Sequence, residues 1–316
     1  MIRLAVLLCV CLVLACCTID EARASEQTRR ILQALDAEYE ATTAVYVNAQ
    51  GALPTNHLAF LKAIDSAYSE SGLTGCKSHL SVAVFSDITL SNKPEYYGCY
   101  GEKFRDSAAS TIKAVLLAAT LHFCDEGLIT LEDQVDGRTV EDHCVAMIAG
   151  SNNNSANALL QYLSYDRING WLAEVGFRDN ELSFGRLFKP TKYVIPSTDD
   201  ENFATAYGLA KFYFLMASPE IDGFLTAGSL NKARKILACN QLNNKSAYND
   251  RLNGKLSSEI TFYHKTGENS QVLGDGGIFS YAGTKYILVV FDSGKDRKAM
   301  QNLGAAIFKL MQEGQL

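Results

Sequence analysis

The stretch Ser110–Asp125 reads Ser-Thr-Ile-Lys-Ala-Val-Leu-Leu-Ala-Ala-Thr-Leu-His-Phe-Cys-Asp, and its apolar residues fall on nearly every side of a helix. Such a helix is covered on all faces, so we expect it at the centre of a core. Its first residue lies near unpaired backbone N–H groups and the positive end of the helix dipole. Lys113 follows one turn later on the same face, and burial lowers the proton affinity of a lysine enough for it to act as a base.

On either side of this helix, hydrophobic periodicity predicts helices and strands near both ends of the chain and mainly helices in the middle. Helices are predicted at 26–40, 56–70, 139–149, from about 155, at 203–217, 229–240 and 295–313, and strands at 79–89, 95–100, 259–265, 277–282 and 285–292, with a loop at 183–200. We therefore predict an α+β fold, in which both chain ends build an antiparallel sheet flanked by helices and an all-helical block is inserted between them.

The predicted domain organisation is a targeting segment at 1–24 followed by one domain at 25–316. The sheet part of that domain is expected at about 56–107 and 225–316, and the helical part at about 108–224. The chain has 316 residues, 47% of them hydrophobic, which is ordinary globular composition with enough apolar surface for a sizeable core. Its net charge of −6 and lack of a basic cluster argue against nucleic acid as a partner.

The targeting segment has a positive Arg3, an apolar stretch at Leu4–Cys17 that is short for a membrane span, and a small-x-small cleavage site at Ala22-Arg23-Ala24. We favour a cleaved secretion signal and an exported protein, periplasmic or extracellular. Val13-Leu14-Ala15-Cys16 also resembles a loose lipobox, which would make Cys16 a lipidated N-terminus. An uncleaved anchor is the third alternative.

Nine cysteines are present, and those outside the targeting segment are Cys76, Cys99, Cys124, Cys144 and Cys239. An exported protein can form disulfides, and the odd number leaves at least one thiol unpaired within the chain. A Cys124–Cys144 disulfide is the favoured pairing, and buried free thiols are an equally supported alternative. No Cys or His spacing indicates a metal site, and we expect no cofactor.

Ser151-Asn152-Asn153 follows Gly150, which is expected to end the preceding helix. The Ser151 hydroxyl can relay a proton to a leaving group, and the Asn153 amide can hold a substrate. Ordinary turn chemistry explains the triplet equally well, because Ser and Asn favour turns. Ser155-Ala156-Asn157 is a second Ser-x-Asn copy close by.

Lys265-Thr266-Gly267 lies on the first of the three closing strands. The lysine and threonine can hold a carboxylate, and Gly267 lets a ligand lie against the strand. The N–H of Glu268 could then join that of Ser110 in an oxyanion hole. The alternative is an exposed strand end without function.

These three motifs, in this order, resemble the class A β-lactamases and their penicillin-binding relatives. The similarity extends from about residue 79 to the C-terminus and is carried by 104–113, by 139–157 and by the hairpin after Gly267. It implies the sheet-plus-helical-block fold with the site at the junction of the two parts. The resemblance implies that Ser110 is the nucleophile and Lys113 the base. It further implies that Ser151 relays a proton and that Lys265 and Thr266 hold a carboxylate.

The chain departs from the family pattern at three positions. Class A enzymes hydrolyse the acyl-enzyme with a Glu in the loop before an Asp-Thr-Thr-like segment. Here that segment is similar to Asn202–Thr205, and counting back places Lys189-Pro190 where Glu-Pro is expected. Asn152 replaces an Asp, and Leu273 stands near the place of an Arg that strengthens the carboxylate grip.

We therefore predict an exported active-site-serine hydrolase that forms an acyl-enzyme on Ser110 with β-lactams or D-Ala-D-Ala-like peptides. The missing Glu predicts poor deacylation, which favours a D,D-peptidase or penicillin-binding protein as the first alternative. A catalytically inactive module that binds cell-wall peptides is the second. A hydrolase using Cys144 and the adjacent His143 is the third, and it is disfavoured because neighbouring helical residues point apart.

Overall fold

The computed structural model describes residues 26, 28–37, 66–67, 69–72, 81–88, 94–100, 106–188, 201–218, 224–242, 251–255 and 260–314. The predicted targeting segment with Cys16, the pair Lys189-Pro190 and Cys76 lie outside these residues. Within the described part of the chain, no helix has the length and apolarity needed to cross a membrane.

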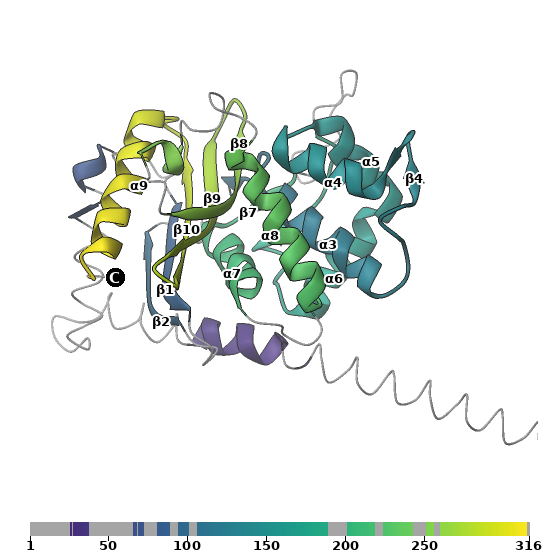
Figure 1. The fold of residues 1–316 in the computed structure, drawn as a ribbon, viewed down its shortest axis with the longest axis horizontal. Helices are drawn as coiled ribbons and strands as arrows, with labels where there is room; N and C mark the ends of the chain where they lie inside the picture. The colour runs from purple at the N-terminus through teal and green to yellow at the C-terminus, as the bar shows by residue number, and fades with distance from the viewer. Residues whose placement is uncertain are drawn as a thin grey trace, which may run out of the picture.

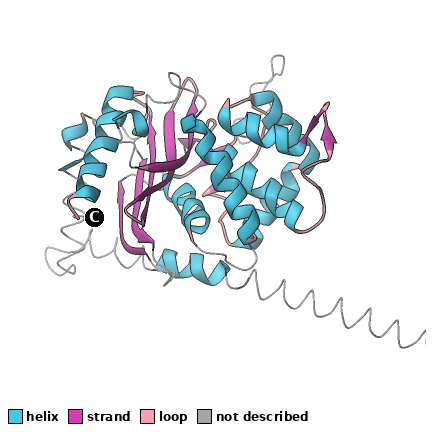
Figure 2. Cartoon of the chain, viewed as in Figure 1, coloured by secondary structure: helices cyan, strands magenta, loops and turns pink. Residues whose placement is uncertain are grey.

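Segments from both sides of the inserted helices in the sequence build one five-stranded antiparallel sheet, as predicted. Figure 2 shows this sheet with helices on both sides. Its strand order is β2-β1-β10-β9-β8. The strands are β1 Ser81–Ile88, β2 Pro94–Tyr100, β8 Thr261–Glu268, β9 Leu273–Tyr281 and β10 Thr284–Asp292. An all-helical block is inserted between β2 and β8 in the sequence, which confirms the predicted fold class.

The sheet is covered on both faces. Helix α9, Arg297–Gln312, packs one face through an apolar cluster that includes Phe262, Phe279 and Met300. Helix α7, Ala206–Ala217, contacts β1, β9 and β10 from the other side (Figure 1). Central strand β10 is accordingly buried along a continuous run rather than at alternate residues.

Strand β9 begins at Leu273, four residues before the predicted start at 277. Three glycines in this stretch hide the strand pattern, because glycine is depleted in strands. The structure explains two of them by close approach. A Cβ on Gly277 would lie 2.2 Å from the carbonyl oxygen of Tyr263, and one on Gly276 would lie 2.9 Å from a methyl carbon of Val289.

The inserted block surrounds α3, Lys113–Asp125, which is buried on nearly all sides (Figure 1). The predicted helix start at Ser110 is wrong by three residues, because residues 109–112 form a tight turn before α3. The remaining helices of the block are α4 Val140–Ala149, α5 Asn153–Leu163 and α6 Tyr165–Val175. Helix α8, Ala227–Leu242, contacts α3, α4 and β8 and thus joins the block to the sheet.

Short elements complete the fold. They are β3 Asp106–Ser107, β4 Gln134–Val135, β5 Arg138–Thr139, β6 Leu182–Ser183, β7 Phe203–Ala204 and the 3-10 helix η1 Leu252–Lys255. Strands β3, β7 and β6 form a second small sheet. The described helical residues 28–37 lie next to α7, where Lys211 is completely buried and its Nζ lies 3.0 Å from Asp36 and 2.7 Å from Glu181.

Candidate active site

Ser110 lies on the turn that connects β3 to α3. Ala109 before it has φ of 45°, a conformation that is uncommon for a residue with a side chain. The turn is closed by Thr111, whose N–H donates to Ala108 O at 3.0 Å and whose hydroxyl donates to the same oxygen at 2.6 Å. The Ser110 side chain remains partly exposed while Lys113 is buried. Strain of this kind needs support from its surroundings, and it often marks a functional turn.

The Lys113 amine lies within hydrogen-bonding distance of three oxygens of the second motif. Nζ lies 2.8 Å from Ser151 O, 2.7 Å from Asn153 Oδ1 and 3.4 Å from Ser151 Oγ. No hydrogen bond joins it to Ser110 Oγ. Burial, and then the charge of Lys265, lower the pKa of Lys113 to about 6. The amine is therefore largely neutral near pH 7, as a base must be.

Ser151 lies between α4 and α5 in a left-handed conformation, with φ of 50°. Its hydroxyl accepts a hydrogen bond from Lys265 Nζ at 3.1 Å, in addition to the contact with Lys113. The neighbouring Asn152 has a structural function, because its side chain caps α5 by accepting from Ser155 N at 2.9 Å. The predicted proton-relay serine thus contacts both predicted functional lysines.

Lys265 and Thr266 are buried residues of β8. Lys265 Nζ also donates to Thr266 O at 2.7 Å. Burial lowers the pKa of Lys265, Asp275 opposes the shift, and Arg251 adds to it, so that the pKa is about 7. The two buried lysines therefore have adjacent pKa values, and each contacts Ser151.

Gly267 brings β8 against the nucleophile turn. A Cβ at this position would lie 2.9 Å from Ser110 N and 2.8 Å from Thr111 N, closer than real Cβ atoms approach. Only glycine lets the two backbones come this close. Glu268 follows directly, so its N–H and that of Ser110 belong to two segments that the structure brings together. All three motifs meet here, at the junction of the sheet with the helical block.

The structure also brings two groups to the site that the sequence did not indicate. The first is Phe188, whose ring centroid lies 4.7 Å from Lys113 Nζ and whose surface is 8% exposed. The sequence predicts Lys189-Pro190 at the place of the deacylating Glu, one position after Phe188. Phe188 belongs to the same loop, and its ring faces the Lys113 amine. Within the described residues, no Asp or Glu forms an ion pair with Lys113.

Three asparagine side chains hold the segment 184–188. Asn157 accepts from Phe188 N at 2.7 Å and donates to Phe188 O at 3.0 Å. Asn169 makes the same pair of contacts with Phe184, at 3.0 and 2.8 Å. Asn202 binds Gly185 and Arg186 through their backbone atoms. Because each amide satisfies backbone groups that have no strand or helix partner, the position of Phe188 is well determined.

The second group is Arg251, whose side chain is 5% exposed and whose charge reaches Lys265. Its guanidinium Nη2 donates to Glu268 Oε2 at 2.9 Å. No Arg stands near Leu273, and the guanidinium beside Glu268 comes instead from Arg251, the residue before η1. No motif surrounds Arg251 in the sequence, which explains why the sequence did not reveal it.

The remaining sequence candidates lie outside this site. Cys124 and Cys144 are free thiols, so the favoured disulfide is wrong. Burial, foremost, raises the pKa of Cys124 to about 11 and that of Cys144 to about 12, which leaves both protonated. His143 contacts Val135 O at 2.7 Å. A Cys144 nucleophile is therefore excluded, since the thiolate is the reactive form.

The chain holds a second Ser-x-x-Lys copy, Ser229-Leu230-Asn231-Lys232, which lies on α8 and makes only structural contacts in the described residues. Ser229 Oγ donates to Asp125 at 2.8 Å, and Lys232 Nζ donates to Glu141 at 2.7 Å. On β8, His264 is turned away from the site and binds Asp275 at 2.7 Å. Among the residues that the structure describes, no group of His, Cys, Asp and Glu side chains could hold a metal ion.

Comparisons with known proteins identify the family and the fold. A family model described as the Beta-lactamase enzyme family matches residues 88–311, and the chain belongs to this family. Solved structures with the same fold include β-lactamases from Sphaerobacter thermophilus (20% identity, TM-score 0.64, 81% of this chain and 98% of that chain) and Xanthomonas campestris (20%, 0.65, 80% and 98%). The structure of PBP-A is similar at 18% identity and a TM-score of 0.64, over 80% of this chain and 96% of that one. No curated protein matches the sequence.

Proposed function

We propose that this chain is an active-site-serine hydrolase that forms an acyl-enzyme on Ser110 with β-lactams or D-Ala-D-Ala-like peptides. One observation carries the proposal: Ser151 Oγ lies 3.4 Å from Lys113 Nζ and 3.1 Å from Lys265 Nζ, and both lysines are buried with lowered pKa values. Two buried amines around one hydroxyl are costly for stability, and they supply a base and a proton relay together.

In the proposed acylation, neutral Lys113 takes the proton of the Ser110 hydroxyl as Oγ bonds to the acyl carbon. The N–H groups of Ser110 and Glu268 stabilise the oxyanion that develops. The C–N bond then breaks, and the leaving nitrogen takes a proton from the Ser151 hydroxyl. Ser151 regains its proton from the lysine that now carries the one removed from Ser110, so the step balances without another reactant.

Substrate is held by groups around this centre. Lys265 and Thr266 bind the carboxyl end of a β-lactam or peptide, and Arg251 adds positive charge behind them. Asn153 already accepts from Lys113 through Oδ1, which leaves its Nδ2 to donate to an acyl-donor carbonyl. Glu268 takes part through its backbone N–H.

Deacylation requires a base that activates water. The Phe188 ring covers the Lys113 amine where a carboxylate is needed, so we expect a long-lived acyl-enzyme. This observation favours a penicillin-binding protein or D,D-peptidase as the second candidate function, over an efficient β-lactamase. We also propose that residues 1–24 direct export to the periplasm or the extracellular space, with a lipid anchor at Cys16 as the alternative outcome of processing.

The test is the reaction of the mature protein with a chromogenic cephalosporin, followed by stopped-flow absorbance and intact-protein mass spectrometry. A burst and a stable adduct on Ser110 support a penicillin-binding protein, and sustained turnover supports a β-lactamase. Ser110→Ala should abolish the adduct, whereas Ser229→Ala, in the other Ser-x-x-Lys copy, should not. Failure of folded protein to form any adduct would refute the enzyme proposal and leave a non-catalytic binding module.

A further inference from the structure

Asp275 is a completely buried carboxylate on β9 that takes no part in the acylation steps. In the pairing of β8 with β9 it lies directly opposite Thr266 of the substrate anchor. Directly opposite residues of an antiparallel pair have Cβ atoms about 5 Å apart on the same face of the sheet. A buried carboxylate is costly unless it is hydrogen-bonded, so the partners of Asp275 indicate what it does.

Each oxygen of Asp275 binds a different segment of the site. Oδ1 lies 2.7 Å from Nδ1 of His264, the residue before Lys265. An ionised carboxylate can only accept, so this ring nitrogen carries the proton and donates it. Oδ2 accepts from Leu252 N at 3.3 Å, and Leu252 directly follows Arg251. One side chain therefore ties the strand of Lys265 to the segment that carries Arg251.

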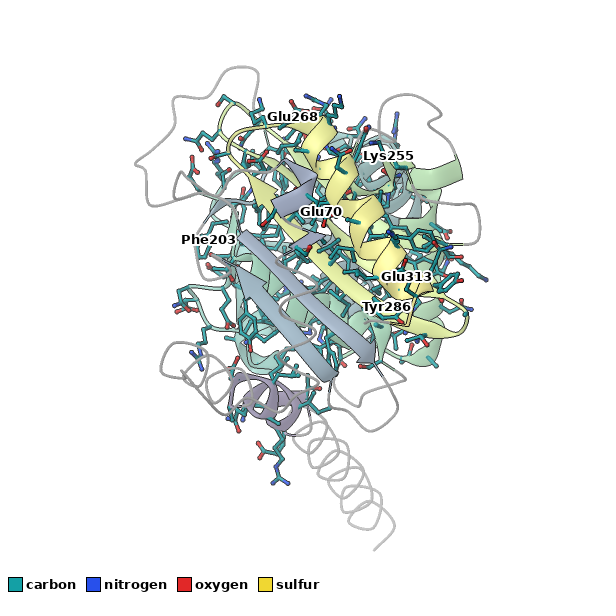
Figure 3. All side chains as sticks on the ribbon, turned by 90° about the vertical axis from the view of Figure 1, so that its left-hand side faces the viewer. Glu70, Phe203, Lys255, Glu268, Tyr286 and Glu313 are labelled. Atoms are coloured by element: carbon teal, nitrogen blue, oxygen red, sulfur yellow. The ribbon has the colours of Figure 1, made fainter. Side chains whose placement is uncertain are left out.

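The segment after Arg251 is closely packed on its other side. It forms η1, which contacts α9. A Cβ on Gly304 of α9 would lie 2.1 Å from Leu252 O, so only glycine lets the two backbones come this close. Lys255 of η1 and Glu268 of β8 lie near the same end of α9 (Figure 3). The segment of Arg251 is thus fixed between α9 and the Asp275 carboxylate.

The Lys265 amine lies among other titratable groups. Lys113 approaches it from α3, since both amines contact the same serine hydroxyl. Burial, foremost, raises the pKa of Tyr213 on α7 well above 10, so this side chain carries no charge. Burial also lowers the pKa of Lys265, and Arg251 adds to that effect, whereas the charge of Asp275 opposes it. Buried charges are screened little by salt, so the effect of Asp275 on Lys265 persists at physiological ionic strength.

We infer that Asp275 is a positioning residue of the substrate anchor: it fixes Lys265 and Arg251 relative to each other and keeps the Lys265 amine charged. Lys113 contacts the same serine hydroxyl, but no Asp or Glu of the described residues forms an ion pair with it. This difference assigns the functions of the two lysines. The amine that Asp275 supports remains a cation that binds the substrate carboxylate, and the other amine is the neutral base. The inference deepens the proposed function and rests on it.

The test follows the charge of Lys265 directly. Ser110→Ala protein with 13C-labelled lysine side chains is titrated by NMR, and the Lys265 signal is assigned from its loss in Lys265→Met. Asp275→Asn keeps the shape of the side chain and removes its charge. We expect Lys265 in this variant to lose its proton at a pH lower by on the order of one unit. The Lys113 titration should not move down with it, because a less charged Lys265 repels a protonated Lys113 less.

Acylation by benzylpenicillin, with Ser110 intact, gives a second readout. In Asp275→Asn the rate should begin to fall about one pH unit lower, which reduces the rate at pH 7 about fivefold. Asp275→Thr, whose β-branched side chain suits a strand, repeats both measurements without the charge if the Asn variant does not fold.

Asp292→Asn is the matched control. Asp292 is also buried, at the end of β10, and its carboxylate accepts from Gly294 N and Asp296 N at 2.9 Å. This substitution should change neither lysine titration. An unchanged Lys265 titration in the folded Asp275 variant, a parallel downward shift of both lysines, or the same shift in Asp292→Asn would each overturn the inference. Failure of the parent to form an adduct refutes the proposed function alone, because the NMR titration needs no chemistry at Ser110.

Discussion

Replacing Lys113 by methionine should change how the stability of the protein depends on pH. In the folded protein the pKa of Lys113 is lowered from 10.5 to about 6, first by burial and then by Lys265. Between these two values the unfolded chain binds more protons than the folded one, so stability rises with pH across this window. Each pH unit contributes about 1.4 kcal/mol. Methionine has a similar shape and never ionises, so the variant lacks this contribution.

The magnitude follows from the contacts of the amine. Keeping Lys113 neutral in the folded protein lowers the free energy of unfolding by about 5 kcal/mol at pH 7 and by about 2 kcal/mol at pH 9. Methionine removes that cost but leaves Ser151 O and Asn153 Oδ1 without their donor, at about 1–3 kcal/mol each. The variant should therefore be more stable than the parent by on the order of 1 kcal/mol at pH 7, and less stable by a similar amount at pH 9.

The assay is urea unfolding at pH 7 and pH 9, followed by far-UV circular dichroism, together with cephalosporin labelling. Lys113→Met should lose labelling while remaining folded. Lys309→Met, which changes a side chain that is 74% exposed, is the control and should show no pH-dependent difference. A stability difference between Lys113→Met and the parent that is the same at both pH values would refute the lowered pKa and, with it, the base.

Three further predictions follow. Acylation needs neutral Lys113, with a pKa of about 6, and protonated Lys265, with a pKa of about 7. The acylation rate should therefore rise with pH near 6 and fall near 7. A rate that is constant from pH 5 to 9 would contradict this assignment. Phe188→Glu should accelerate deacylation on the order of 100-fold by placing a carboxylate beside the amine, as measured by loss of the adduct in mass spectrometry, whereas Phe188→Gln should not; equal rates would show that Phe188 does not block the base position. Lys211→Met should lower the free energy of unfolding in urea by about 3–5 kcal/mol, because it leaves the buried Glu181 carboxylate without its cation. A decrease below about 1 kcal/mol would mean that the pair contributes no net stability.

The closing strands and the central helix were predictable because their patterns are local. Helix α3 is apolar on nearly every side, and β10 contains a continuous run of buried residues, so each can be recognised from its own sequence. Errors arose where local rules do not hold. The turn before Lys113 depends on a strained Ala109, and the glycines of β9 are set by neighbouring strands rather than by propensity.

The residues of the site were predictable where they belong to one of the three motifs. Lys113, Ser151 and Lys265 were all named from the sequence, and the structure brings their polar atoms within hydrogen-bonding distance. Their meeting could not be derived from spacing, because it requires β8 to lie against the start of α3. Only the resemblance to a known family predicted that arrangement.

The sequence by itself determined the fold class and the residues with the chemistry to act, because periodicity and residue type are properties of the chain alone. Only the tertiary structure decided what surrounds them. It placed the Phe188 ring over Lys113 through asparagines distant in sequence, paired Arg251 with Glu268, and left Cys144 as a free buried thiol. The physical reason is that burial, pKa and charge pairing depend on groups brought together across loops, and no local pattern encodes those contacts.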